Sequence, residues 1–280
     1  MMAAVQLEPR RVEKLWGRRA LWGKFDDVPE TATPVGEIWF EDPRGGDPEL
    51  LVKYLFTSEK LSVQVHPDDV AARKAGYPRG KDEAWFVLAA DPHAVIGLGL
   101  REIMSKEELR AAALDGSVED KLHWQAVKAG DVFYSPAGTV HAIGAGVTLV
   151  EIQQNVDLTY RLYDYGRPRE LHLDEAVAAA DPVPYVAPFV PTEASKGRLI
   201  LADGPAFVLE HWAMARSGTI DGDGRPIWVI PLKGTGTIGS TAFAPGQTWL
   251  VEGGTELTTE HGSELLVAYP GRGIIRDIWR

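Results

Sequence analysis

The chain has 280 residues, of which 45% are hydrophobic and 25% are charged, proportions typical of a globular protein with one or two domains. It has no cysteine, which excludes disulfides and thiolate chemistry, and no run approaching the ~20 apolar residues of a membrane-spanning helix. Because the start of the chain also lacks the uninterrupted apolar core of a secretory signal, we expect a cytoplasmic protein. Its formal net charge of −11 repels nucleic acid and anionic lipid, so we expect no nucleic-acid or membrane partners.

Short strands separated by turns are predicted along most of the chain, which contains 29 glycines and 19 prolines. Segments rich in branched and aromatic residues predict strands at 50–56, 61–66, 84–90, 131–136 and 147–154. Helices are expected at 68–76, 105–116 and 172–180. The second of them opens with Ser105 and Glu108 in capping-box spacing and ends at Gly116. The pattern favours a mainly β protein with a few short helices.

A proline-rich stretch divides the chain. Residues 181–196 carry prolines at 182, 184, 188 and 191, a density that prevents a regular strand ladder and favours an extended linker. From Gly197 the alternation of strands and turns resumes. We therefore predict a first domain at 1–180, a linker at 181–196 and a second, jelly-roll domain at 197–280.

Gln64 and His66 are two residues apart in the expected strand 61–66, so their side chains point to the same face. Their Cα atoms then lie about 6.6 Å apart, close enough for both side chains to reach one metal ion. A half-buried strand with one polar face fits the same pattern. The two residues are thus candidate ligands that need further ligands from elsewhere in the chain.

Two such candidates follow. Glu83 stands at the start of the apolar strand 84–90, where a simple strand-end charge is the alternative, and Lys81 shares its face if the strand has already begun. His141 comes directly after the tight turn formed by Pro136, Ala137 and Gly138. Two imidazoles and a carboxylate suit zinc, and leave room for an amide oxygen and a water or substrate.

The stretch from Gly130 to His141 reads Gly, five residues, Pro, one residue, Gly, two residues, His, and it resembles the second motif of the cupin superfamily of metal-binding β-barrels. The first cupin motif usually carries His-x-His, whereas this chain has Gln64-Val65-His66. With that change, the segments LSVQVHPDD, GKDEAWF, SPAGTVHAI and LVEIQQNVDLTYRLYDYGRPRELHLDEA are together similar to type I mannose-6-phosphate isomerase in its short bacterial form. EKLWG and GEIW, at 13–17 and 36–39, extend the resemblance toward the N-terminus.

This resemblance implies two cupin-like jelly-roll β-barrels and one Zn²⁺ per chain, held in the first by Gln64, His66, Glu83 and His141. It implies Arg161 as the catalytic arginine and Lys81 and Glu151 as active-site neighbours. The reaction it implies interconverts mannose 6-phosphate and fructose 6-phosphate by proton transfer through an enediol(ate). The second domain has neither metal motif, so we expect it to be a degenerate, metal-free barrel that covers the first.

The chemistry of these residues agrees with that reaction. Because Gln64 is neutral, the ion keeps a net positive charge. Arg161 can stabilise the enediolate or bind the substrate, although pairing with Asp157 or Asp164 is the alternative. A cation beside Lys81 lowers the pKa of its ammonium, which makes it a candidate proton carrier or phosphate contact.

Two further roles stay open at this point. Ser62 shares the face of Gln64 and can donate to the phosphate. Glu151 either takes part in proton transfer or only orients Lys81 or Arg161. The sequence does not identify the general base.

Other functions fit the same ligands. One is a metal-dependent cupin that acts on an unphosphorylated sugar, or an iron-dependent oxygenase, which favours more histidine ligands. Another is a non-catalytic sugar-binding cupin. All of these imply a small-molecule ligand, and the sequence indicates no protein partner.

Overall fold

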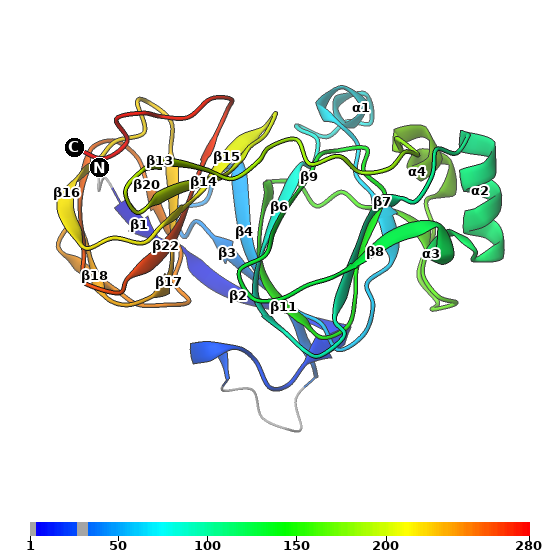
Figure 1. Cartoon of the computed structure of the whole chain (residues 1–280), viewed down its shortest axis with the longest axis horizontal. Helices are drawn as coiled ribbons and strands as arrows, with labels where there is room; N and C mark the ends of the chain where they lie inside the picture. The colour runs from blue at the N-terminus through cyan, green and yellow to red at the C-terminus, as the bar shows by residue number, and fades with distance from the viewer. Residues whose placement is uncertain (1–3, 27–32) are drawn as a thin grey trace.

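The computed structural model describes residues 4–26 and 33–280. Within those residues the chain forms four α-helices and 22 β-strands, so the prediction of a mainly β protein is confirmed. Figure 1 shows two β-rich units side by side along the longest axis, with the helices at the outer side of one of them. We call the unit with β2 to β12 the first unit, and the unit with β1 and β13 to β22 the second unit.

The first unit consists of two antiparallel sheets. The six-stranded sheet has the order β2 (Glu8–Arg18), β3 (Val35–Glu41), β4 (Leu50–Phe56), β11 (Val147–Gln154), β6 (Glu83–Ala90) and β9 (Val132–Ser135). The five-stranded sheet has the order β12 (Tyr160–Tyr163), β5 (Val63–Val65), β10 (His141–Ile143), β7 (Val95–Leu100) and β8 (Leu122–Ala126). A shared core, to which Trp85 and Leu149 contribute from one sheet and Leu98 and Ile143 from the other, packs them face to face.

The elements predicted in this unit are present, β4 and β11 with the expected ends and the others with shifted ends. The strand expected at 61–66 is only Val63–Val65, so His66 lies just beyond it. The three expected helices are α1 (Asp69–Lys74), α2 (Lys106–Asp115) and α4 (Leu173–Ala179), and a short α3 (Val118–Lys121) was not predicted. The capping box of Ser105 and Glu108 is formed, and Gly116 ends α2 with a φ of 84°.

The second unit also has two sheets. One has the order β1 (Ala4–Gln6), β20 (Trp249–Val251), β17 (Ile227–Lys233), β22 (Glu264–Pro270), β15 (Phe207–Trp212), β14 (Arg198–Asp203) and β13 (Thr192–Ser195). The other has the order β16 (Arg216–Ile220), β21 (Thr255–Thr259), β18 (Gly236–Ile238) and β19 (Thr241–Phe243). Strand β13 lies inside the expected linker, and β1 joins this unit from the other end of the chain. The domain boundaries at 180 and 197 stay a prediction.

A large apolar core joins the two units. It contains Val52, Tyr54 and Ile152 from the six-stranded sheet, and Phe207 and Trp228 from the seven-stranded one. The six-stranded sheet is therefore covered on both faces, which explains why every residue of β4 is buried. Alternate side chains of its central strands point to the second unit, and the others point into the first unit. None of the helices in residues 4–26 and 33–280 is both long and apolar enough to cross a membrane.

Candidate metal centre and active site

Three predicted ligands, His66, Glu83 and His141, meet in the interior of the first unit. Their ligating atoms all lie within 4.8 Å of one another, and each side chain is at most 2% exposed. Nε2 of His66 is 3.2 Å from one oxygen of Glu83, and Nε2 of His141 is 3.5 Å from the other. The three residues come from different strands: His66 follows β5, Glu83 begins β6 and His141 begins β10.

Backbone carbonyls set the orientation of both imidazole rings. Nδ1 of His66 is 3.0 Å from the carbonyl oxygen of Leu158, and Nδ1 of His141 is 2.9 Å from that of Thr139. Because a carbonyl oxygen only accepts hydrogen bonds, each Nδ1 carries the hydrogen and each Nε2 turns a lone pair toward Glu83.

The cluster therefore gathers the acceptor atoms of three side chains, and neither imidazole ring presents an N–H to the carboxylate. Burial lowers the pKa of His141, and it lowers the pKa of His66 to about 3, so both rings are neutral. Burial alone would raise the pKa of Glu83, but the charge of Lys81 outweighs it and holds that pKa well below its ordinary range. Nε2 of His66 and Oε2 of Glu83 have no hydrogen-bond partner among the described residues. Neutral imidazoles and a carboxylate arranged in this way fit a metal cation.

Gln64, the fourth predicted ligand, contacts the same cluster. It lies directly opposite His141 in the pairing of β5 with β10, and its amide nitrogen is 3.2 Å from Nε2 of His141. The hydroxyl of Ser62 donates to the amide oxygen at 3.2 Å. The oxygen and the nitrogen of a side-chain amide have nearly the same shape. A rotation of the Gln64 amide group by a half-turn therefore brings its oxygen to the cluster and its nitrogen to Ser62. Ser62 thus touches Gln64, and its expected contact with a phosphate stays a prediction.

Arg161 stands on the other side of Gln64. The pairing of β12 with β5 places it directly opposite Gln64, and it lines the cavity over the cluster. Its Nε is buried and has no hydrogen-bond partner among the described residues. Asp164, one of the alternative partners, is instead bound by Arg167 and Arg169, each at 2.6 Å. Burial lowers the pKa of Arg161, and the neighbouring Arg169 adds to that effect.

A second row of side chains faces this one from the six-stranded sheet. Trp39, Lys53, Glu151 and Trp85 are in register across β3, β4, β11 and β6. Nζ of Lys53 is 3.3 Å from a Glu151 oxygen, and Trp85 donates to the other oxygen at 3.1 Å. Burial raises the pKa of Glu151, and the charge of Glu83 raises it further. The sequence analysis missed Lys53, although a lone lysine in an otherwise apolar strand was the available signal.

Lys81 links the two rows. Its Nζ lies 3.0 Å from Oε1 of Glu83 and 3.5 Å from the hydroxyl of Thr159. Burial alone would lower the pKa of Lys81, but Glu83 and Glu151 outweigh it and hold that pKa above its ordinary value. The carboxylates of the chain itself surround the ammonium, and the lowered pKa expected beside a bound cation stays a prediction.

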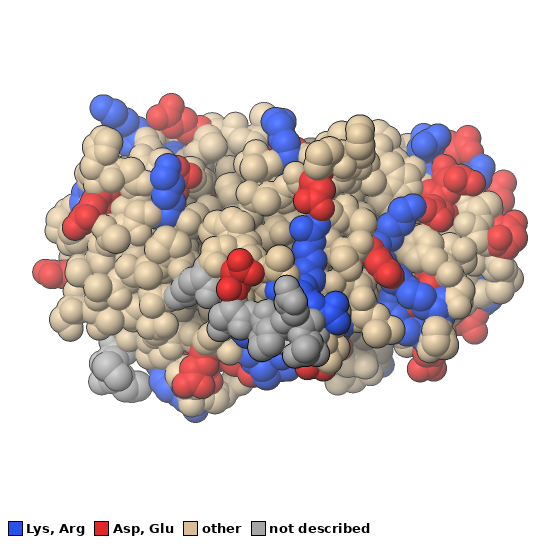
Figure 2. All heavy atoms as spheres, turned by 90° about the horizontal axis from the view of Figure 1, so that it is seen from below, with Lys and Arg blue, Asp and Glu red and all other residues tan. Residues whose placement is uncertain are grey.

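The cavity over the cluster has a volume of ≈ 80 Å³ and a strongly polar lining. The predicted site residues line it except for His66 and His141. Further charged side chains in the lining are Lys14, Glu37, Lys53, Asp157 and Arg169. On the outer face shown in Figure 2, basic and acidic side chains are interspersed. The cavity is lined by five basic side chains and four acidic ones, in a chain that is acidic overall.

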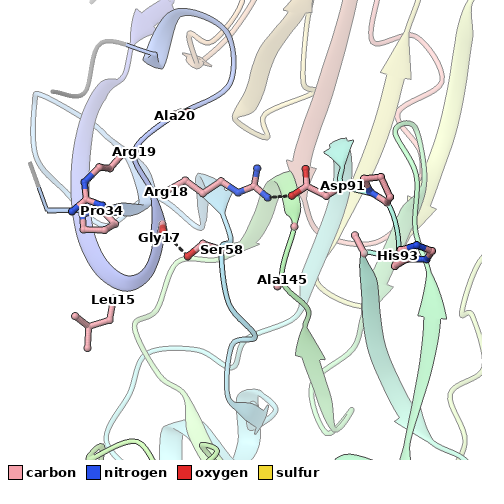
Figure 3. A pocket seen from close by; sticks show the side chains of 13 residues that line it. Leu15, Gly17, Arg18, Arg19, Ala20, Pro34, Ser58, Asp91, His93 and Ala145 are labelled. Atoms are coloured by element: carbon pink, nitrogen blue, oxygen red, sulfur yellow. Dashed lines mark hydrogen bonds and ion pairs between the residues drawn. The ribbon is translucent and has the colours of Figure 1, made fainter. Parts of the chain in front are cut away.

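A larger and more open hollow of ≈ 770 Å³ lies elsewhere on the first unit, beside the ends of β2 and β6 (Figure 3). Its lining includes His93 and the ion pair of Arg18 with Asp91. None of the predicted site residues lines it. The candidate chemistry is concentrated in the smaller cavity.

The chain was compared with known sequences, and no family model matches it. A mannose-6-phosphate isomerase of Streptococcus mutans is 35% identical over 311 aligned residues, covering 92% of this chain and 98% of that protein. A mannose-6-phosphate isomerase of Bacillus subtilis is 40% identical over 156 residues, covering 51% of this chain and 49% of that protein.

Solved structures show the same relationship. The crystal structure of the mannose 6-phosphate isomerase from Bacillus subtilis is 27% identical with a TM-score of 0.81, covering 95% of this chain and 99% of that one. A mutant phosphomannose isomerase from Salmonella typhimurium, 14% identical with a TM-score of 0.73, shares the fold and covers 96% of this chain and 99% of its own. The expected fold class of two cupin-like jelly-roll barrels with a few short helices is confirmed.

Proposed function

The chain belongs to the mannose-6-phosphate isomerase family, and we propose that it interconverts mannose 6-phosphate and fructose 6-phosphate with one bound zinc ion. The observation that carries the metal proposal is the convergence, in a buried place, of two imidazole Nε2 atoms and a carboxylate to which neither ring presents an N–H. Gln64, His66, Glu83 and His141 would hold the ion. When bound, the zinc supplies Lewis acidity that draws electron density from an oxygen of the substrate.

The neutral amide of Gln64 matters for that chemistry. Among the four proposed ligands only Glu83 is anionic, so the site keeps a net positive charge. Glu83 is also the residue that Lys81 contacts, at 3.0 Å. A positive site beside a cationic side chain favours a substrate that carries negative charge.

We propose that Arg161 stabilises the charge that develops during the reaction. Removing the proton from C2 of the aldose leaves its electron pair delocalised onto O1 as an enediolate. Movement of the hydroxyl proton from O2 to O1, together with the return of a proton to C1, then gives the ketose. A partly buried guanidinium, whose buried Nε has no partner among the described residues, lies beside the proposed ligand Gln64. It offers a hydrogen-bond donor and a positive charge to the enediolate oxygen. Asp164 is bound by Arg167 and Arg169, so Arg161 does not have to leave that carboxylate before it binds the substrate.

We assign the proton transfer itself to Lys81 and Glu151. Both line the cavity, and both are buried titratable groups whose pKa values are displaced by their neighbours. Ser62, Lys81 and Arg161 are the proposed contacts of the phosphorylated substrate. The cytoplasmic location stays a prediction from the composition.

A coupled assay tests the proposal. The chain is stripped with a chelator, and the formation of fructose 6-phosphate from mannose 6-phosphate is followed before and after addition of Zn²⁺. We expect turnover to disappear with the metal and to return with zinc. Unphosphorylated mannose is the matched substrate control, and equal turnover of it would contradict a sugar-phosphate enzyme. Tight zinc binding without any turnover would favour the non-catalytic sugar-binding alternative, and activity restored only by iron would exclude zinc.

A further inference from the structure

The carboxylate of Asp82, the residue before Glu83, makes two hydrogen bonds that the metal chemistry does not explain. It is buried, with 6% of the residue exposed. One oxygen accepts from the hydroxyl of Tyr134 at 2.7 Å, and the other accepts from the backbone N–H of Ala137 at 2.8 Å. Asp82 lies directly before β6, and its partner Tyr134 belongs to the core that joins the two units. Asp82 is therefore directed toward the second unit, while Glu83 is directed toward the metal cluster.

The turn that Asp82 holds is connected to both histidine ligands. It comprises residues 136–139. The backbone N–H of Gly138 donates to the carbonyl oxygen of His66 at 2.8 Å, and the carbonyl oxygen of Thr139 accepts from Nδ1 of His141 at 2.9 Å. A displacement of this turn would therefore move both imidazole rings relative to Glu83.

On its other side, Tyr134 packs against the second unit. Its ring centroid is 5.1 Å from that of Phe207, the first residue of β15. The turn before β15 is closed by the N–H of Gly204, which donates to the carbonyl oxygen of Phe207 at 3.0 Å. A Cβ on Gly204 would lie 2.0 Å from Cζ of Tyr134, so only glycine leaves room for the ring in this position. These contacts with the second unit therefore fix the position of the Tyr134 ring and of its hydroxyl group.

We propose that Asp82 and Tyr134 are positioning residues through which the second unit holds the metal site in shape. The turn at 203–207 fixes the Tyr134 ring, the hydroxyl of that ring orients Asp82, and Asp82 holds the turn at 136–139. This inference rests on the proposed function, since it concerns the same metal site. It gives the second unit a part in zinc binding, although the ligands found in the described residues all come from the first unit.

The first test removes a single hydroxyl. We expect Tyr134→Phe to weaken zinc binding about tenfold, the size of effect seen when a partner of a metal ligand is lost. Zinc affinity is measured by competition with a chromophoric chelator, independently of catalysis. The matched control is Tyr185→Phe, because the Tyr185 hydroxyl makes a bond of the same 2.7 Å length, to the backbone oxygen of Tyr134. We expect that control to keep zinc affinity within about twofold, even where both variants lose similar stability in urea unfolding without metal.

The second test acts from the second unit. Gly204→Ala places a methyl group where the Tyr134 ring lies, so we expect it to weaken zinc binding as Tyr134→Phe does. Gly254→Ala is its matched control in the same unit, because the nearest atom to a Cβ there is 3.5 Å away. That control should bind zinc like the parent chain.

The outcomes separate the two proposals. Weaker zinc binding by Tyr134→Phe and Gly204→Ala, with both controls unchanged, supports the positioning role. A parent chain that binds zinc and turns over mannose 6-phosphate, together with variants of unchanged affinity, overturns the positioning role alone. A parent chain that retains no zinc overturns the proposed function, and the positioning role fails with it.

Discussion

Gln64 on β5 and Arg161 on β12 are direct cross-strand neighbours, and His141 is the neighbour of Gln64 on the opposite side. Side chains paired in this way project from the same face of the sheet. The neutral amide therefore separates a metal ligand from a guanidinium that has no partner at Nε among the described residues. In the proposed function, this spacing lets Arg161 act on a substrate bound at the metal without being a ligand itself, and it leads to the first prediction.

Replacing Arg161 should affect turnover and leave the metal in place. We expect Arg161→Ala to lower kcat by about 10²-fold or more, because it removes a charged donor from the developing enediolate. Zinc content per chain, measured by atomic absorption after dialysis, should match that of the parent. Arg167→Ala is the control, since Arg167 is held by Asp164 and lies outside the cavity lining. Normal turnover in Arg161→Ala would remove this arginine from the mechanism.

Replacing Lys81 should lower turnover without weakening the binding of zinc. The ammonium lies 3.0 Å from Glu83 and competes with a metal ion for that carboxylate. We expect Lys81→Met to lower kcat and to bind zinc as tightly as the parent chain or more tightly, because a like charge has been removed. Chelator competition gives the affinity. Clearly weaker zinc binding in this variant would show that Lys81 supports the ligand set instead of opposing it.

The buried pair of Lys53 and Glu151 should contribute to stability. Each side chain is at most 6% exposed, so Lys53→Met leaves an unneutralised carboxylate in the interior. We expect a loss of about 3 kcal/mol in the free energy of unfolding, measured with urea, and partial recovery in the double variant Lys53→Met/Glu151→Gln. The exposed lysine of the pair Lys60–Glu119 serves for comparison, and Lys60→Met should cost at most about 1 kcal/mol. Equal effects at the two sites would contradict a buried ion pair.

Acidification should destabilise the metal-free chain. The folded chain holds His66 at a pKa of about 3, against an ordinary value of 6.5, so between these pH values the unfolded chain binds a proton that the folded chain does not. The free energy of unfolding should therefore fall as the pH drops below 6.5, by about 1.4 kcal/mol for each pH unit and each such group. His141, whose pKa is also lowered by burial, adds to this slope.

Urea unfolding of the metal-free chain between pH 7.5 and 5 measures this slope, and His66→Gln should flatten it. Glu83 acts in the same direction at lower pH, because its folded pKa is also depressed. A slope unchanged by His66→Gln would mean that the imidazole is already protonated in the folded chain.

Much of the candidate site could be predicted from local sequence. The spacing of Gln64 and His66 on one strand face and the turn before His141 are properties of a few consecutive residues. So are the capping box at Ser105 and the apolar alternation that predicts the strands. These signals depend on backbone geometry that neighbouring residues impose on one another. The order of the motifs along the chain was enough to suggest the family.

Only the tertiary structure decided which strands lie side by side and which faces meet. From the sequence alone, the single lysine of an apolar strand, Lys53, has no evident partner. The pairing of β4 with β11 places it beside Glu151. The hydrogen bonds that turn both Nε2 atoms inward come from the backbone at Leu158 and Thr139, and the backbone of Thr139 belongs to the turn that Asp82 holds. Register and sheet packing join residues far apart in the chain, and a one-residue slip would reverse every face. Sequence therefore determined which residue types were available for the chemistry, and the fold decided which of them meet.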